Sequence, residues 1–190
     1  MSQRRAFRPQ RRPIYIGCEG ASEVGYVSVL HDMVRAAEKP LHLIIEELGP
    51  GAGDPLARVE MAVRRIKLLS RTRTAPVEKY VLLDSDQAER DVARGKRAIA
   101  LATETDIKII WQRPCFEAVL LRHIDGRANH KPPDTPKAQR DIERDWPGYR
   151  KPMTRWDLAK RINLDSLIRV ANVEHELAAL LRCLEILPGE

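Results

Sequence analysis

Two aspartates, Asp84 and Asp86, stand one residue apart directly after the apolar residues 81–83. A short apolar run without alternation is typical of a strand buried on both faces of a parallel sheet. The two acids would then lie at the carboxyl end of that strand, where open α/β sheets bind their ligands. A bend there would turn both carboxylates toward one ion, and oxygen-only ligands suit Mg²⁺ or Mn²⁺. The alternative is that one aspartate caps the following helix.

Glutamates stand at two further predicted strand ends. Glu19 follows the first strand pattern of the chain, Glu117 follows the fourth, and Glu23 lies about one helical turn after Glu19 as a supporting candidate. Carboxylates that converge on one sheet edge repel one another unless a divalent cation is bound. A bound Mg²⁺ could stabilise charge on a phosphate and lower the pKa of an attacking water, which indicates phosphodiester chemistry. The candidate catalytic residues are Glu19, Asp84, Asp86 and Glu117, and the first three are also the candidate metal ligands.

Strand and helix patterns alternate through the first two thirds of the chain, which predicts an α/β fold with a mostly parallel central sheet flanked by helices. The predicted strands are residues 14–18, 41–48, 79–84 and 107–111. The predicted helices between and after them are residues 22–37, 55–70 and 87–102, with a fourth that starts at Pro114 and ends near His123. A polar loop at 125–136, expected to be mobile, leads to predicted helices at 137–145, 154–162 and 165–187.

Local signals suggest where these helices begin. Ser22 suits the N-cap of the first helix, and Asp54 with Pro55 suits the start of the second, which is expected to expose Arg58 among other basic residues. The glycine-rich residues 49–53 before it have neither the P-loop ending nor a GxGxxG spacing, so they predict a turn. Asp165 or Ser166 would start the last helix.

The apolar stripe of the last predicted helix fits core packing. The stripe comprises Leu167, Ile168, Ala171, Leu177, Leu180, Leu181 and Leu184. The alternative is a contact with a second copy of the chain, giving a homodimer, or with a partner.

The composition belongs to a globular protein. The chain has 190 residues, of which 43% are hydrophobic and 32% charged, and no apolar run approaches the roughly eighteen residues of a membrane span. Three scattered cysteines without a CxxC pair indicate reduced thiols in a cytoplasm. We expect a flexible tail at 1–12, an α/β domain at 13–124, and a loop with a helical C-terminal extension packed on it at 125–190.

The basic charge is concentrated in the tail. Five arginines and no acid within residues 1–12 carry +5 of the net charge of +6, which leaves +1 for the rest of the chain. An arm of this kind, including Arg11 and Arg12, can bind nucleic acid phosphates. The alternative is a solubilising disordered end.

Three ordered blocks resemble the RloB-like family. They are residues 18–23 (CEGASE) followed by Tyr26, residues 83–86 (LDSD), and residues 114–123 (PCFEAVLLRH). RloB-like proteins resemble compact members of the Toprim superfamily, and this resemblance implies a Toprim-like fold with Glu19 as general acid/base and Asp84 and Asp86 as Mg²⁺ ligands. The third block implies a further site at Glu117 and His123, although His123 could instead pack between helices.

Two positions near these blocks depart from the family pattern. The family usually has Ser-Asn before the proline, where this chain has Gln112 and Arg113. Arg113 therefore places a cation next to the acids, where it would bind phosphate or neutralise Glu117. Lys151 resembles a tyrosine-lysine feature of the family, shifted by one residue.

The resulting expectation is a Mg²⁺-dependent nuclease, or another phosphoryl-transfer enzyme acting on DNA or RNA. The resemblance also implies a role in phage defence, with defence proteins or an ATPase chain as partners. One alternative is a slow or inactive module that binds nucleic acid or a nucleotide in a defence complex. Another is a subunit whose last helix docks a partner through Leu177 and Leu181.

Overall fold

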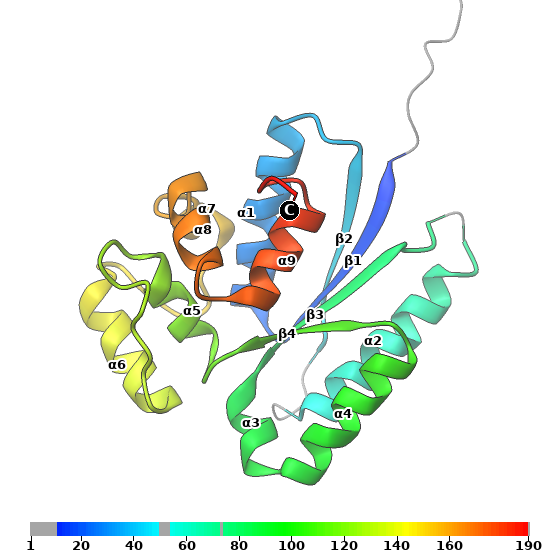
Figure 1. Cartoon of the computed structure of the whole chain (residues 1–190), viewed down its shortest axis with the longest axis horizontal. Coiled ribbons are helices and arrows are strands. Elements are labelled where there is room, and N and C mark those ends of the chain that lie inside the picture. The colour runs from blue at the N-terminus through cyan, green and yellow to red at the C-terminus, as the bar shows by residue number, and fades with distance from the viewer. Residues whose placement is uncertain (1–10, 50–53, 73, 190) are drawn as a thin grey trace, which may run out of the picture.

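The computed structural model describes residues 11–49, 54–72 and 74–189. Four parallel strands form one sheet in the order β2-β1-β3-β4 (Figure 1). They are β1 (Arg12–Cys18), β2 (Leu41–Glu47), β3 (Glu78–Asp84) and β4 (Lys108–Gln112). The helices between them are α1 (Ala21–Ala36), α2 (Pro55–Leu69), α3 (Ser85–Arg90) and α4 (Val92–Glu104). The predicted α/β fold with a parallel sheet flanked by helices is confirmed.

The strand order reverses between β1 and β3. The chain leaves β1 toward β2 on one side and later returns to place β3 on the other side of β1. In open α/β sheets, ligands bind outside the carboxyl ends of the two strands at such a switch point. Glu19 and Asp84 stand at those two strand ends.

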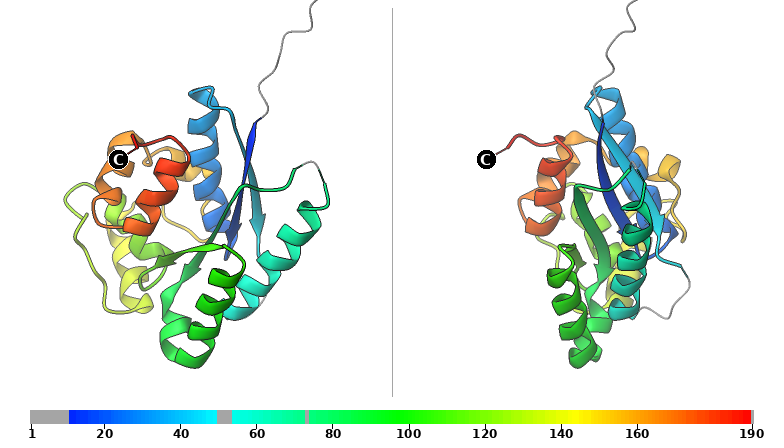
Figure 2. Two further views of the ribbon diagram at one scale, coloured as in Figure 1. Left: turned by 45° about the vertical axis from the view of Figure 1, so that its right-hand side comes forward. Right: turned by 90° about the vertical axis from the view of Figure 1, so that its right-hand side faces the viewer.

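The sheet separates two apolar cores. Along β3, Tyr80 and Leu82 face the first core, whereas Val81 and Leu83 face the second, as the period of a strand requires. Figure 2 shows α2 and α4 together on the second face and α1 with the C-terminal helices on the first. The unbroken apolar run before Asp84 is therefore buried on both faces.

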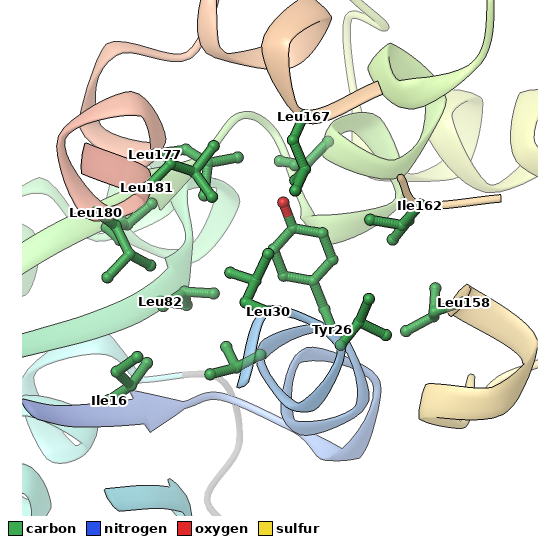
Figure 3. Close-up of a cluster of buried hydrophobic side chains, with 14 of the residues drawn as sticks. Ile16, Tyr26, Leu30, Leu82, Leu158, Ile162, Leu167, Leu177, Leu180 and Leu181 are labelled. Atoms are coloured by element: carbon green, nitrogen blue, oxygen red, sulfur yellow. The ribbon is translucent and has the colours of Figure 1, made fainter. Parts of the chain in front are cut away.

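The residues after β4 are mostly helical and share the first core with α1. They form α5 (Phe116–His123), α6 (Thr135–Asp145), α7 (Arg155–Ala159), α8 (Leu164–Ala171) and α9 (His175–Cys183). Figure 3 shows Tyr26 of α1 among leucine and isoleucine side chains from this part of the chain. The extension thus completes the first core, and the leucines of the predicted stripe, Leu167, Leu177, Leu180, Leu181 and Leu184, are buried in it.

Two predicted helices are each broken in two. The helix expected at 87–102 is α3 and α4, because Asp91 ends the first and its carboxylate accepts from the backbone N–H of Arg94 at 3.0 Å. The helix expected at 165–187 is α8 and α9. Its N-cap is Asn163, which exchanges hydrogen bonds with Ser166, and Ile168 of the predicted stripe is 44% exposed.

Three predicted ends also differ. Ser22 does not cap α1; Gly20 holds that position, and the Ser22 hydroxyl accepts from the backbone N–H of Met153 at 3.0 Å. Pro114 follows a cis peptide bond and precedes α5 rather than opening it. Arg12, expected in the tail, begins β1.

The start of α2 is as predicted, since the Asp54 side chain accepts from Leu56 N at 3.0 Å and Pro55 is the first helical residue. Most of the predicted glycine-rich turn, residues 50–53, lies outside the described residues.

Candidate active site at the carboxyl edge of the sheet

Glu19 and Asp84 are joined at the carboxyl edge by backbone hydrogen bonds. The Glu19 carboxylate accepts from the backbone N–H of Asp84 (Oε2 to N, 2.9 Å). The Asp84 carboxylate in turn accepts from the backbone N–H of Phe116, the first residue of α5 (Oδ1 to N, 2.8 Å). These two bonds tie the ends of β1 and β3 to the start of α5, so the two predicted residues lie side by side.

Two buried glutamates complete a carboxylate cluster, by which we mean Glu19, Glu23, Asp84 and Glu117. Glu23 on α1 is 5% exposed, and Glu117 on α5 is 1% exposed. Glu117 Oε1 accepts from the Tyr149 hydroxyl at 2.8 Å and from Lys151 Nζ at 2.7 Å. Its other oxygen, Oε2, is buried and has no hydrogen-bond partner among the described residues. Lys151, a supporting candidate in the sequence, is thus part of the site.

Negative charge exceeds positive charge in the cluster. Burial raises the pKa of Asp84 well above its ordinary value, and the charges of Glu19, Glu23 and Glu117 raise it further. Burial, with Glu19 and Glu117, likewise raises the pKa of Glu23 to about 7. Each of these carboxyls resists ionisation chiefly because it is buried, and further because its neighbours are also acids.

Two cations offset part of this charge. Burial alone would raise the pKa of Glu117, but hydrogen bonds and charge from Lys151, together with Tyr149, outweigh it and hold that pKa below its ordinary value. Burial also raises the pKa of Glu19, and the hydrogen bond from Asp84 and the charge of Arg58 offset this in part.

Arg58 is the cation that the sequence interpretation misplaced. It was expected on the exposed face of α2, yet it is only 6% exposed and donates to the carbonyl of Leu48. It stands among the buried positions of that helix, between Leu56 and Val59. Arg58 falls on the apolar face of α2, a helix that starts near the carboxyl edge of the sheet. This spacing is the sequence feature that could have predicted its burial.

Asp86 has partners of its own outside the carboxylate cluster. Its Oδ2 accepts from the Thr135 hydroxyl at 2.9 Å and lies 3.7 Å from Arg90. The chain enters α3 immediately after Asp84, and the N–H groups of Ser85 and Asp86 donate to the Pro114 carbonyl at 3.2 Å. The bend of both carboxylates toward a single ion stays a prediction, and the charge of Asp86 contributes to the raised pKa of Glu19. Asp84 occupies the N-cap position of α3 without a side-chain capping bond.

The donor atoms of the carboxylate cluster fit a hard divalent cation. All are carboxylate oxygens, and Glu117 Oε2 is buried without a partner. Within residues 11–49, 54–72 and 74–189, however, no three His, Cys, Asp or Glu side chains are already arranged around a common metal position. The predicted ligand set of Glu19, Asp84 and Asp86 stays a prediction.

Arg113 does not approach the acids of the site. Its guanidinium donates to Glu176 at 2.8 and 3.3 Å, so it neutralises that residue and not Glu117 as expected. The cause is the position of α9, whose first turn lies beside β4 and presents Glu176. Arg113 lines an open pocket of about 510 Å³ with Lys131 and His175.

His123 packs between helices, which was the alternative to a site role. It is 3% exposed, its Nε2 lies 3.1 Å from the Tyr26 hydroxyl, and its Nδ1 lies 2.9 Å from the Val119 carbonyl. Burial lowers the pKa of His123 to about 4, so the imidazole is neutral at physiological pH. It therefore brings no charge to the site.

Arg11 and Arg12 lie at the opposite edge of the sheet from the cluster. Arg12 begins the seven-residue β1 and donates to the Cys183 carbonyl at 2.9 Å, whereas Glu19 follows the other end of that strand. A strand of this length spans roughly 20 Å. Binding of nucleic acid by these arginines stays a prediction, and such a contact would be remote from the acids.

Comparisons with known proteins identify a family but no individual relative. The family model described as RloB-like protein matches residues 14–175, a span that contains every acid of the cluster. No curated protein and no solved structure matches the chain significantly. Within the described part of the chain, every helix is too short or too polar to cross a membrane.

Proposed function

The chain belongs to the RloB-like family, and from its carboxylate cluster we propose that it is a Mg²⁺-dependent enzyme that cleaves phosphodiester bonds in nucleic acid. The single observation that carries this proposal is the excess of buried and partly buried acid at the switch point of the sheet. Four carboxyls share the site with two neighbouring cations, Lys151 and Arg58, and the pKa of Asp84 is raised well above its ordinary value. Such a cluster costs stability, and a bound cation would relieve it.

Glu19 and Asp84 are the residues best placed to hold the ion. Each engages one carboxylate oxygen with a backbone N–H, which fixes its orientation and leaves the second oxygen for another partner. When bound, Mg²⁺ (or Mn²⁺) would supply a Lewis acid for the phosphate and an acidified water. Asp86, whose one oxygen is held by Thr135, would contribute only through its second oxygen or its charge.

Glu23 is suited to proton transfer. It is buried beside Glu19, and its pKa of about 7 lets it both accept and release a proton near neutral pH. The family resemblance predicts the proton-handling role for Glu19. The pKa of Glu23 favours assigning that role to Glu23 instead.

Lys151 would bind the phosphate that enters the site. Its side chain is 57% exposed, and its ammonium group reaches Glu117 from the solvent side. Tyr149 also donates to the same Glu117 oxygen, so that oxygen keeps a partner when Lys151 turns to a phosphate. Lys151 thus offers the positive charge that Arg113 was expected to provide.

The wider setting of this activity is also a proposal. The resemblance to Toprim enzymes supports DNA or RNA as substrate, and the resemblance to the RloB-like family supports a role in phage defence. Three scattered cysteines without a CxxC pair support a location in the cytoplasm. Defence proteins or an ATPase chain as partners, and a homodimer, belong to the same proposal.

One observation favours a second candidate, a module that binds nucleic acid or a nucleotide without turnover. Asp86 is held by Thr135 and Glu117 is paired with Lys151, so the described residues present no preassembled three-residue metal site. A module of this kind would bind its ligand as tightly with chelator as with metal.

Cleavage assays with single- and double-stranded DNA and RNA separate the two candidates. Each substrate is incubated with Mg²⁺, Mn²⁺ or chelator and with wild type, Glu19→Gln or Asp84→Asn. We expect metal-dependent cutting that falls at least about a thousandfold in both variants. Asp106→Asn is the matched control, because Asp106 is exposed on the turn before β4 and asparagine tolerates its positive φ of 54°.

Cutting that survives either substitution would mean that the site is wrong. Binding without cutting under every metal condition would support the second candidate.

A further inference from the structure

A tryptophan on α7 is displayed to solvent. Trp156 is 67% exposed, whereas Trp146 is 2% exposed and Trp111 is half-buried. The guanidinium of Arg155 lies over the Trp156 ring, 4.2 Å from its centroid. Tryptophan is enriched at interaction surfaces, because its side chain combines a large apolar ring with a polar N–H group.

Positive charge gathers around this tryptophan. Residues 150–161 hold five cations and one acid, a net charge of +4, whereas the chain outside this segment and residues 1–12 has a net charge of −3. The side chains of Arg150 and Lys160 are 74% and 72% exposed. Both lie near the single acid, Asp157, at 3.5 and 3.1 Å, and such exposed pairs are weak enough to exchange for another anion.

The segment is held firmly against α1, the helix that carries Glu23. The backbone N–H of Met153 donates to the Ser22 hydroxyl at 3.0 Å, and Leu158 is fully buried in the first core. A Cβ atom at Gly25 would lie only 2.6 Å from the Met153 carbonyl oxygen, so this close approach requires glycine. Figure 1 shows α7 beside α1. The backbone that carries the exposed side chains of Trp156, Arg150 and Lys160 is therefore held in place by its packing against α1.

The same segment reaches the carboxylate cluster. Lys151 contacts Glu117, and Trp156 follows Lys151 by five residues, which limits their Cα separation to about 18 Å. Positive charge here would also hold a polyanion close to an acidic site that would otherwise repel it.

We propose that residues 150–161 bind an unpaired strand of nucleic acid, with Trp156 stacked on a base and Arg150 and Lys160 on backbone phosphates. This inference rests on the proposed function and specifies its substrate as single-stranded. Base faces are open to stacking only where bases are unpaired, and a basic groove with an aromatic side chain is the usual way to bind such strands. The strand then continues past Lys151 to the acids.

Binding is measured in chelator, so that no cleavage intervenes, with a fluorescein-labelled single strand of about fifteen nucleotides and its duplex form. Trp156→Ala should weaken single-strand binding roughly tenfold and duplex binding much less. Leu164→Ala is the matched control, because Leu164 is 50% exposed on the neighbouring helix and should leave binding unchanged.

The charge contribution is tested separately. The double variant Arg150→Ala and Lys160→Ala should reduce the slope of log affinity against log salt by about 1.4. The variant Arg64→Ala with Lys67→Ala removes the same charge from exposed positions on α2, across the sheet, and should not change the slope.

The intrinsic fluorescence of Trp156 gives a direct measure of binding. Oligonucleotide binding should quench the intrinsic fluorescence of the wild type, and Trp156→Phe should lose that quenching while keeping part of the affinity.

Several results would overturn the inference. They are unchanged affinity in Trp156→Ala, equal losses in Leu164→Ala, or a homodimer in solution that Trp156→Ala dissociates. The test of single-strand binding can succeed or fail independently of the test of the proposed enzyme activity. Single-strand binding that needs Trp156 but is never followed by cutting supports the inference and rejects the enzyme, whereas cutting with binding indifferent to Trp156 does the reverse.

Discussion

Two buried carboxylate regions of this protein differ in how many cations surround them. At the carboxyl edge, Glu19, Glu23, Asp84 and Glu117 lie within reach of one another and share Lys151 and Arg58. On α6, Asp141 is fully buried and lies next to three basic side chains. It contacts Lys137, lies 3.1 Å from Arg144, and accepts from His130 Nε2 at 2.8 Å.

The pKa values of the two regions shift in opposite directions. Hydrogen bonds from Lys137 and His130 outweigh burial and lower the pKa of Asp141 to about 2. Burial and neighbouring acids instead raise the pKa of Asp84. Burial of a carboxyl therefore does not by itself indicate function; the balance of charges within reach does. Asp141 links α6 to His130 in the loop before it. The carboxylate cluster instead holds more acids than neighbouring cations among the described residues.

The largest expected effect is a contrast in stability between two aspartates. At pH 7, Asp141→Asn should lower the melting temperature by about 10 °C, because the buried carboxylate loses the charge that pairs with Lys137 and Arg144. Asp84→Asn should raise the melting temperature. Asparagine keeps an oxygen that accepts from the Phe116 N–H, and it removes a carboxylate that the neighbouring acids repel. Thermal unfolding followed by circular dichroism measures both.

The pH dependence of this contrast follows from the sign of each shift. A lowered pKa gives Asp141 a stabilising effect that is present above its ordinary value of 3.8 and is lost as the pH falls through about 2. The deficit of Asp141→Asn should therefore shrink in strong acid. Melting temperatures that shift in the same direction for both variants at pH 7 would contradict the comparison.

A smaller effect is expected at Glu23. Its folded pKa of about 7 exceeds its ordinary value of 4.5, so the stability linked to it is complete below about 4.5 and is lost as the pH rises through about 7. Glu23→Gln should raise the melting temperature by about 5 °C near pH 8 and leave it unchanged near pH 4. Glu143→Gln, at an exposed position on α6, is the matched control. A constant difference across this pH range would show that Glu23 does not titrate as described.

The smallest expected effect is stabilisation by metal. Millimolar Mg²⁺ should raise the melting temperature of the wild type by about 3 °C near pH 8, and by less near pH 5, where the cluster takes up protons. The gain should vanish in Asp84→Asn and persist in Asp141→Asn. An equal gain in both variants would place the metal elsewhere on the protein.

Much of the fold could be predicted from local pattern. The uninterrupted apolar run before Asp84 indicated a strand buried on both faces, and helical spacing in α1 indicated the face that packs on the sheet. Glu19 and Asp84 could be placed at one edge because parallel neighbouring strands end together. Helix breaks at Asp91 and at residues 172–174 were missed. The first depends on a single capping group, the Asp91 carboxylate, within a long helical pattern, and the second has no side-chain cap at the start of α9.

Cation pairing in the site could not be predicted. Lys151 reaches Glu117 across 34 residues, Arg113 turns to Glu176 across 63 residues, and Arg58 lies inward on α2. The hydrogen bond from Thr135 to Asp86 spans 49 residues in the same way.

The amino-acid sequence by itself determined the sheet, the carboxyl edge at which the acids lie and two of those acids. It does so because strand periodicity and the common end of parallel strands are properties of short segments. Only the tertiary structure decided which charges meet there. A long polar side chain can form ion pairs of similar free energy with many different partners. The pair that it forms depends on where the last seventy or so residues of the chain pack.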